Sequence, residues 1–524
     1  MSGSLLLQGY PFDEEVPDGW AMAPLGMISE SIRPGFASGE HNNEAEGIPH
    51  LRPMNISSQG EIDLSDVRYV ASDKSSLRIE EGEVLFNNTN SPAWVGKSAV
   101  IRGSGEYAFS NHMTRLKVND HFIDSDFIAR QLHYLSTSGY FQIHCKKHVN
   151  QASISSGVLE QSVPILIPPL AEQKRIVARI EQLQAHSRRA RAALESIPDL
   201  LEQLRQSILA AAFRGDLTKK WREQHPDVEP ASELLKRIRT ERRKRWEASE
   251  LEKLKARGLT GNQLDAEFTK RRKQYQEPEP MDALDLPDLP EGWCWTSMGD
   301  VFKVYVGATP SRKKAEYWGN RHHWVSSGEV AWNRITGTSE KITAEGLANT
   351  STCLHPPGTV LLGMIGEGKT RGQAAILEIE ACNNQNSAAI RVSETPIPPE
   401  YIYRYLQYQY VQTRGGAMGN NQPALNKSKV ESILFPLMPL KEIEAAIETV
   451  GALLASSDSV GVSAKEMLSR SSFLDQSILS KAFRGELVPQ DPNDEPASVL
   501  LDAIRQEKAR QTAARKSNGK RKGK

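Results

Sequence analysis

Residues 204–217 read LRQSILAAAFRGDL, and residues 474–487 read LDQSILSKAFRGEL. The two stretches lie one fixed distance apart, since 483 − 213 = 270. The same offset relates Pro169-Leu170 to Pro439-Leu440, and an offset of 290 − 17 = 273 relates the tetrads that begin at Pro17 and Pro290. This period is far longer than the roughly 20 to 50 residues of stacked repeats. The chain therefore consists of two halves, each a variable block followed by a helical block.

The repeat divides the chain into six expected segments. A first variable block is followed by a first spacer helix and a charged helical linker, and then by a second variable block, a second spacer helix, and a C-terminal helix with a basic disordered tail. In that order the boundaries are 1–165, 166–217, 218–287, 288–435, 436–487 and 488–524.

Each helical block carries an apolar stripe. From Ile176 to Ala211 the stripe positions alternate by four and three residues, the spacing of a coiled-coil seam, and adding 270 gives the second stripe. Each stripe could pack on its neighbouring domain, but matching stripes favour pairing of the two helices with each other. Pro198 predicts a kink or restart, and Gly215 and Gly485 predict the helix ends. The predicted spacer and docking residues are Ile176, Ile180, Leu183, Leu204, Ile208, Phe213, Leu453, Leu474, Ile478 and Phe483.

The composition is that of a soluble, multidomain protein. The 524 residues include 65 basic and 65 acidic side chains, so net charge does not identify a partner. Four cysteines without a CxxC pair exclude a disulfide framework and the usual structural zinc spacings, and they fit a reducing cytoplasm. We find no signal peptide and no run of about 20 apolar residues, so we expect no membrane span.

The variable blocks contain short hydrophobic runs bounded by Gly, Asn and Ser, which predict strands joined by polar turns and an α+β fold. Their turns carry basic, amide, hydroxyl and aromatic side chains, the types that contact phosphates and base edges. A solvated loop with core tryptophans would have the same composition. The candidate DNA contacts are Arg52, Asn55, Asn87, Asn88 and Lys97 in the first block, and Thr309, Ser311, Arg312, Lys313, Tyr317, Trp318, Ser326, Ser327, Arg334, Lys369 and Arg371 in the second.

Gly363 to Thr370 matches the GxxxxGK[ST] pattern of a phosphate-binding loop. A phosphate-binding loop is followed by a helix, but residues 371–377 have a glycine at their second position and favour a strand. We expect no matching loop in the other repeat. An ATP-dependent enzyme is therefore the weaker alternative, and Lys369 and Arg371 are better assigned to a phosphate backbone.

We find no zinc-protease, nucleophile-elbow, dinucleotide-binding or base-methylating motif, which indicates a non-catalytic chain without a cofactor or metal of its own. Two segments are strongly basic. Residues 236–257 hold ten basic and four acidic side chains, and residues 505–524 hold nine and one. Such runs are usually solvated helix or tail, although phosphate screening is a second reading.

The duplicated helix ending in AFRG(D/E)L, the PLxE entry and the Gly307-Ala308-Thr309-Pro310-Ser311-Arg312 loop resemble the specificity subunits of Type I restriction-modification systems. The resemblance covers nearly the whole chain. It implies that each variable block is a target recognition domain for one half of a bipartite site in double-stranded DNA. It also implies that the helices form an antiparallel coiled coil that fixes the gap and docks two methyltransferase subunits.

The resemblance further implies restriction subunits as partners, S-adenosylmethionine in the methyltransferase, and ATP and Mg²⁺ in the restriction subunit. The first block lacks the Gly-x-Thr-Pro-Ser loop, so we expect the two halves of the site to differ. A coiled-coil scaffold that binds DNA without sequence preference is the remaining alternative. The bases read and the gap length do not follow from the sequence.

Overall fold

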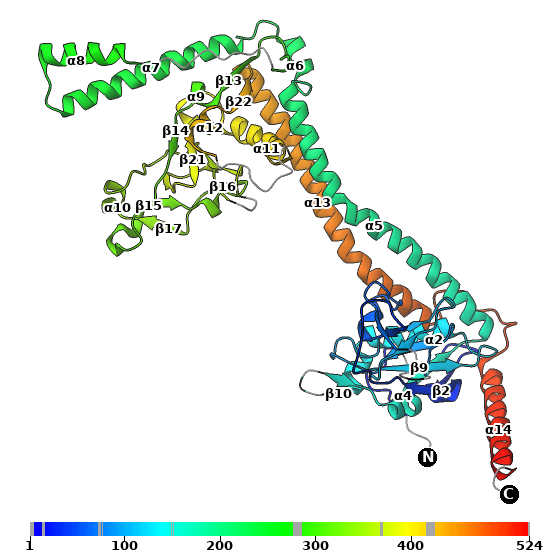
Figure 1. The fold of residues 1–524 in the computed structure, drawn as a ribbon. Coiled ribbons are helices and arrows are strands. Elements are labelled where there is room, and N and C mark those ends of the chain that lie inside the picture. Colours follow the sequence, from blue (N-terminus) through cyan, green and yellow to red (C-terminus); the bar gives the residue numbers. More distant parts are fainter. Residues whose placement is uncertain are drawn as a thin grey trace. The chain divides into compact units, whose positions relative to one another are not determined.

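The computed structural model describes residues 5–521 apart from 13–15, 72–74, 76, 148, 150, 276–285, 367–369 and 416–424. It divides into two compact units, one made of Met1–Ser196 and Ala464–Lys524 and the other of Ile197–Ser463. Each unit holds one variable block and one end of both long helices, α5 (Leu170–Arg214) and α13 (Leu440–Phe483) (Figure 1). The compact units therefore differ from the two repeats along the chain.

The first variable block folds around a four-stranded antiparallel sheet in the order β2-β9-β5-β7. The central strand β5 is buried along its whole length, as its apolar Val-Leu-Phe sequence requires. Helix α2 packs across β5 and β7. The bounds are β2 (Ser29–Pro34), β5 (Val84–Asn87), β7 (Ser98–Val100), β9 (Met113–Val118) and α2 (Ser125–Thr137). Smaller elements are β3 (Ile48–Leu51), β4 (Arg68–Val70), β6 (Thr89–Asn90), β8 (Ala108–Phe109), α3 (Tyr140–His144), β10 (Lys146–Lys147) and β11 (Ala152–Ser153).

The second variable block contains a five-stranded sheet in the order β14-β21-β18-β19-β16 and a three-stranded sheet in the order β17-β15-β20. Helix α11 packs on β18 and β19. The bounds are β14 (Val304–Val306), β15 (Trp318–Val325), β16 (Asn333–Ile335), β17 (Glu340–Ile342), α10 (Ala344–Ala348), β18 (Val360–Gly363), β19 (Ala374–Leu377), β20 (Ala381–Asn383), β21 (Ser387–Ile390) and α11 (Pro399–Gly415).

The two variable blocks share one strand register although their sequences differ. Strands β2, β9, β5 and β7 pair as β14, β21, β18 and β19 do, at spacings of 272 to 276 residues (306 − 34 = 272 and 363 − 87 = 276). The equivalent pairs are Pro34–Thr114 and Val306–Ala388, Asn87–Met113 and Gly363–Ser387, and Val84–Val100 and Val360–Ile376. The predicted α+β class is confirmed, and the internal repeat extends through the variable blocks.

A two-stranded ribbon closes each block, and the repeated entry motifs meet beside it. The indole Nε1 of Trp20 donates to Glu172 Oε2 at 3.1 Å, and Trp293 Nε1 donates to Glu442 Oε2 at 2.8 Å. Each entry tryptophan is thus tied to the first turn of the long helix that follows its block. The ribbons pair β1 (Ala21–Pro24) with β12 (Pro164–Ile167) and β13 (Cys294–Ser297) with β22 (Leu434–Leu437). Four short helices flank them, namely α1 (Leu25–Ile28), α4 (Ser156–Ser162), α9 (Met298–Val301) and α12 (Lys427–Glu431).

The long helices pair antiparallel within each unit, which confirms the expected coiled coil. In the first unit Ile176 and Ile180 share a core with Ile478, and Arg191 forms an ion pair with Asp475 at 3.1 Å. In the second unit the partners are Ile208, Leu209 and Ala212 on α5 and Val450 and Leu454 on α13. Helix α5 continues through Pro198, so the expected restart is absent. At 1.5 Å per residue its 45 residues extend about 67 Å.

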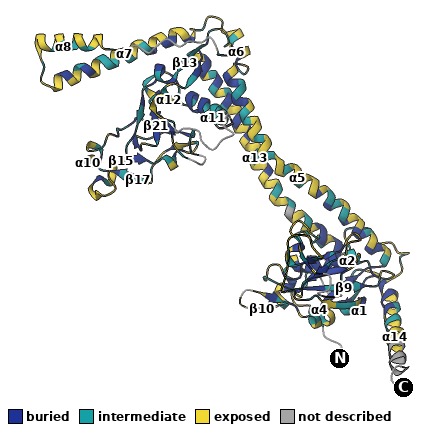
Figure 2. Ribbon diagram, in the orientation of Figure 1, coloured by how far each residue is buried: buried dark blue, intermediate teal, exposed yellow. Residues whose placement is uncertain are grey.

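The seam has a different phase from the predicted one at every second position. Ser187 and its repeat Ser457 are buried as expected. The buried positions that precede them are Gln184 and Leu454, one residue after the predicted Leu183 and Leu453. Leu204, Leu453 and Leu474 are 46%, 39% and 53% exposed. Exposed stretches run along both long helices (Figure 2). These three leucines therefore lie outside the seam, which is a correction to the predicted stripe.

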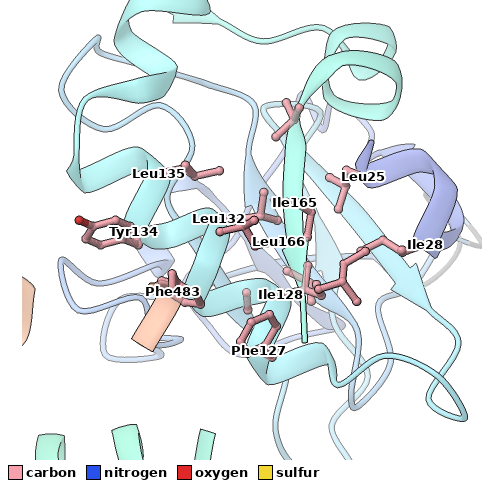
Figure 3. Close-up of a cluster of buried hydrophobic side chains, with 14 of the residues drawn as sticks. Leu25, Ile28, Phe127, Ile128, Leu132, Tyr134, Leu135, Ile165, Leu166 and Phe483 are labelled. Atoms are coloured by element: carbon pink, nitrogen blue, oxygen red, sulfur yellow. The ribbon is translucent and has the colours of Figure 1, made fainter. Parts of the chain in front are cut away.

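The phenylalanine of each AFRG motif ends its helix inside a core. Phe483 packs on Phe127 and Tyr134 of the first variable block, with ring centroids 5.4 and 5.8 Å apart (Figure 3). Phe213 packs in the same way on Tyr401 and Tyr408 of the second block, at 5.6 and 5.7 Å. Each long helix thus starts from one variable block and ends in the core of the other.

The basic segments form helices that extend the repeat. Arg242 donates to the carbonyl oxygens of Gly299 and Asp300, and Lys508 donates to those of Gly26 and Ser29 at 2.7 and 2.8 Å. These contacts fix α7 and α14 against equivalent positions of the two variable blocks. The basic side chains that make them are bonded to the protein itself. The helices are α6 (Lys219–Gln224), α7 (Ala231–Ala256), α8 (Gly261–Lys273) and α14 (Ala497–Arg521). Helix α14 runs into the segment predicted as a disordered tail. Among the helices of the described residues, none is long and apolar enough to cross a membrane.

Candidate nucleic-acid interface

Four loops of the second variable block gather at one end of its sheets. Residues 307–313 follow β14, 326–332 follow β15, 364–373 join β18 to β19, and 384–386 join β20 to β21. The backbone connects them, because Met364 N donates to Asn386 O at 2.8 Å and Asn384 N donates to Val325 O at 3.1 Å. Most of the candidate DNA contacts of this block lie on these loops, as the sequence predicts.

The loop that begins at Gly307 is held rigidly against the turn at 384–386. A Cβ atom on Gly307 would stand 1.8 Å from the carbonyl oxygen of Asn383, so only glycine fits there. Ala308 N donates to that oxygen at 3.1 Å, and Trp324 Nε1 donates to Ala308 O at 3.0 Å. Thr309 Oγ1 donates to Gln385 Oε1 at 2.6 Å. The polar side chains on this loop are therefore presented from fixed backbone positions.

Arg312 is bound within its own domain. Its guanidinium lies 3.8 Å from the ring centroid of Trp318 and forms a bidentate ion pair with Glu340. The hydrogen bonds from Arg312 lower the pKa of Glu340, which keeps the pair charged. Arg334 is likewise bonded to Glu378 and Glu400. Both arginines stabilise the loop end of the domain, and a direct contact with DNA stays a prediction for each.

The other predicted side chains of the second block fall into two groups. Ser311 and Lys313 are exposed on the 307–313 loop, and Thr309, Trp318, Ser326, Ser327 and Arg371 are partly exposed. Tyr317 is buried, with its hydroxyl bonded to Lys314 Nζ at 2.8 Å. Lys369 lies outside the described residues. The exposed group forms the accessible surface of this loop end.

In the first block, four of the five predicted DNA contacts are buried. Asn55 donates to the carbonyl oxygens of Asp63 and Asp66 at 2.9 and 3.0 Å, and Asn88 donates to Asn111 O and Thr114 Oγ1. Asn87 donates to Pro53 O, and Lys97 Nζ donates to Ile56 O. Arg52 is partly buried and lies 3.7 Å from Asp66. Their present contacts give these residues a role in shaping the turns, and direct DNA contact by them stays a prediction.

The phosphate-loop pattern lies on a β-hairpin. Strand β18 ends at Gly363 and antiparallel β19 begins at Ala374, where a phosphate-binding loop requires the start of a helix. A loop of the same length joins β5 to β7 in the first block, so the expectation of no counterpart was wrong. Gly372 N donates to Gly363 O and Gly96 N donates to Asn87 O, both at 2.8 Å. The described part of the loop is therefore a repeated hairpin connection.

Each variable block contains a buried histidine that is uncharged near neutral pH. Burial lowers the pKa of His50 to about 4, with the neighbouring His41 as the second cause. Burial also lowers the pKa of His355 to about 4, and Arg391 adds to the shift. Among the described residues no group of three His, Cys, Asp or Glu side chains could hold a metal ion. What the arrangement offers is a set of fixed polar turns for recognition.

Comparison with known proteins gives a family match and several relatives. The family model of the Type I restriction modification DNA specificity domain matches residues 17–196 and 290–453. The chain is 26% identical to the Type I restriction enzyme StySPI specificity subunit of Salmonella potsdam, over 94% of this chain and 96% of that protein. It is also 26% identical to the EcoKI specificity subunit of Escherichia coli K12, over 94% and 97%.

The fold is similar to that of solved structures. The HsdS subunit from Thermoanaerobacter tengcongensis superposes with a TM-score of 0.55 at 17% identity, covering 92% of this chain and all of that one. A chain solved in work on complex assembly and conformational transition of the type I R-M system superposes with a TM-score of 0.56 at 16% identity, over 90% of this chain. The likeness extends through both variable blocks and both long helices.

Proposed function

Because this chain belongs to the family of Type I restriction modification DNA specificity domains, we propose that its two variable blocks are recognition domains for the two halves of an asymmetric DNA site. The observation that carries this proposal is the shared strand register of the two blocks, which present unlike loops from equivalent positions. Equivalent scaffolds place loops in equivalent places, and unlike loops read unlike bases. Asymmetry of the site follows from the sequence difference.

The paired helices act as the spacer between the two halves of the site. An antiparallel pair with apolar seams and ion pairs such as Arg191–Asp475 resists bending better than a single helix. Since each helix joins the core of both blocks through its two ends, its length limits how the recognition domains can be arranged on DNA. A change in helix length should therefore change the gap and leave the half-sites intact.

The outer surface of the helix pair docks partner subunits. On α5 the positions 183, 190, 197 and 204 step by seven and hold Leu, Ala, Ile and Leu, and on α13 the equivalent positions hold Leu453, Val460, Met467 and Leu474. Val460 and Met467 are 49% and 58% exposed. An apolar position beside the seam, repeated every heptad, is typical of helices that pack in larger bundles. This surface, the flanking stripe, suits helices of the methyltransferase subunits, expected in two copies.

The chain itself is non-catalytic in this proposal. S-adenosylmethionine would bind to the methyltransferase partner, and ATP and Mg²⁺ to the restriction partner. The hairpin at Gly363, which lacks the helix of a phosphate-binding loop, favours this over an ATP-dependent enzyme. The rigid, unlike loops favour it over a scaffold without sequence preference.

Methylation-sensitive long-read sequencing tests the proposal. Genomic DNA should carry methyladenine in a split motif when the gene is intact and lose it when the gene is disrupted. A matched control restores the gene with a silent change. Identical methylation in both strains would contradict the proposed function.

A further inference from the structure

We propose that Asn111 and Gln385 are equivalent base-reading residues, one in each recognition domain, and that each amide recognises an adenine in its half of the site. This inference rests on the proposed function and deepens it by naming a reader and its base. Neither residue stands out in the sequence, where Asn111 lies between Ser110 and His112 and Gln385 lies in an amide-rich run.

The two residues occupy the same place in the two domains. Asn111 lies on the turn from β8 to β9, and Gln385 lies on the turn from β20 to β21. Strand β8 is parallel to β3, and β20 is parallel to β15, while β9 and β21 are the equivalent strands of the main sheets. The offset 385 − 111 = 274 is also that of β9 and β21. Topology therefore pairs these positions without any sequence identity between them.

Both turns are held by the same two backbone neighbours. On one side, Phe36 N donates to Phe109 O at 3.2 Å and Ala308 N donates to Asn383 O at 3.1 Å. The preceding residues are Gly35 and Gly307, where a Cβ atom would stand 2.1 and 1.8 Å from those carbonyl oxygens. The chain must pass this close to each turn, and only glycine permits it.

On the other side, the hairpin loop bonds to the last residue of each turn. Asn88 N donates to His112 O at 3.1 Å, and Met364 N donates to Asn386 O at 2.8 Å. Each turn is thus fixed between two loops, with one residue at its apex. A residue held in this way keeps its position when DNA binds, as accurate reading of one base requires.

The apex side chains are exposed, and a hydroxyl orients each amide. Thr309 Oγ1 donates to Gln385 Oε1 at 2.6 Å, and Ser110 Oγ donates to Asn111 Oδ1 at 3.3 Å. Neither amide nitrogen has a hydrogen-bond acceptor within the described residues. Since an amide oxygen accepts two hydrogen bonds, each side chain keeps one acceptor and two donors for a ligand.

This free hydrogen-bonding pattern matches one base edge. In the major groove adenine presents the N7 acceptor next to the N6 donor, and an Asn or Gln amide can bond to both. Two neighbouring amides are already engaged, because Asn383 bonds to Ser387 and His355 and Asn88 bonds to Thr114. Asn111 and Gln385 are the apex amides that combine exposure, orientation and free donors.

The test is selection from randomised duplexes by the full chain in complex with its own methyltransferase subunits. Gln385→Ala should lose about tenfold to hundredfold discrimination at one A·T pair in one half of the selected motif, with the other half unchanged. Asn111→Ala should give the mirror result. Gln385→Glu keeps the shape, and it should shift the preference at that pair toward cytosine, whose N4 amino group donates to a carboxylate.

Gln263→Ala, an exposed amide on α8, is the matched control and should leave the motif unchanged. Thr309→Val should weaken discrimination at the same base pair as Gln385→Ala, because the amide loses its orienting hydroxyl. An unchanged motif with both Gln385 variants overturns the proposal, as does an equal loss of preference at every position of the half-site. Failure of the unmodified complex to select any motif would instead refute the proposed function.

Discussion

Replacing Phe213 by alanine should loosen the second recognition domain and leave the first intact. Phe213 lies at the end of α5, the helix that follows the first domain in the sequence. The ring is 7% exposed and lies 5.0 Å from Tyr405, between ring centroids, and slightly farther from Tyr401 and Tyr408. Loss of a buried phenylalanine costs about 3–5 kcal/mol. Because a domain of this size is stable by about 5–15 kcal/mol, the loss should be large enough to open the domain measurably.

Hydrogen exchange measured by mass spectrometry localises the effect. Phe213→Ala should raise exchange in α11 and β22, and Phe483→Ala should raise it in α2 and β12. Phe473→Ala is the matched control, since this side chain is 71% exposed on α13 and its loss should cost less than about 0.5 kcal/mol. Faster exchange in α2 after Phe213→Ala would refute the crossed arrangement of helix ends.

Three further predictions concern charge, pH and docking. Glu442→Gln should lower the free energy of unfolding in urea by about 3 kcal/mol, because Arg222 loses its buried partner. Glu172→Gln, at the carboxylate bonded to Trp20, should lower it by clearly less. Equal losses from the two variants would contradict this. Since burial lowers the pKa of His355 from 6.5 to about 4, this residue should cost stability as the pH falls from 6.5 toward 4, by about 2 kcal/mol near pH 5. His355→Gln should remove this contribution from the pH dependence of unfolding. Leu474→Glu should abolish co-purification with the methyltransferase subunit and leave the melting temperature unchanged. Ser477→Glu should change neither co-purification nor the melting temperature.

The repeat, the α+β class and the paired helices could be predicted because their signals are local and occur twice. The AFRG motif and the entry tryptophans are nearly identical in the two repeats. The structure shows why: the two phenylalanines, Phe213 and Phe483, fill equivalent cores. The two tryptophans, Trp20 and Trp293, bond to equivalent carboxylates. The seam phase failed because Leu204 and its repeat are apolar without lying in the seam. A stripe beside the seam satisfies the same heptad spacing as the seam itself.

The recognition surface could be predicted only as a set of loops. Asn55, Asn87 and Asn88 have the residue type that reads bases, but an amide satisfies the carbonyl groups of a buried turn equally well, and one sequence does not distinguish these uses. The equivalence of Asn111 and Gln385 depends on strand register, since neither the residues nor their neighbours match.

The central claim, that paired helices space two separate readers, is tested most directly by lengthening both helices together. One heptad inserted after Leu194 and another after Ala464, which are equivalent positions, keeps the seam in phase and adds about 10 Å. Methylation sequencing should then show both half-sites unchanged and a gap about three base pairs longer, at 3.4 Å per pair. Altered half-sites, or the original gap in an active complex, would contradict the account.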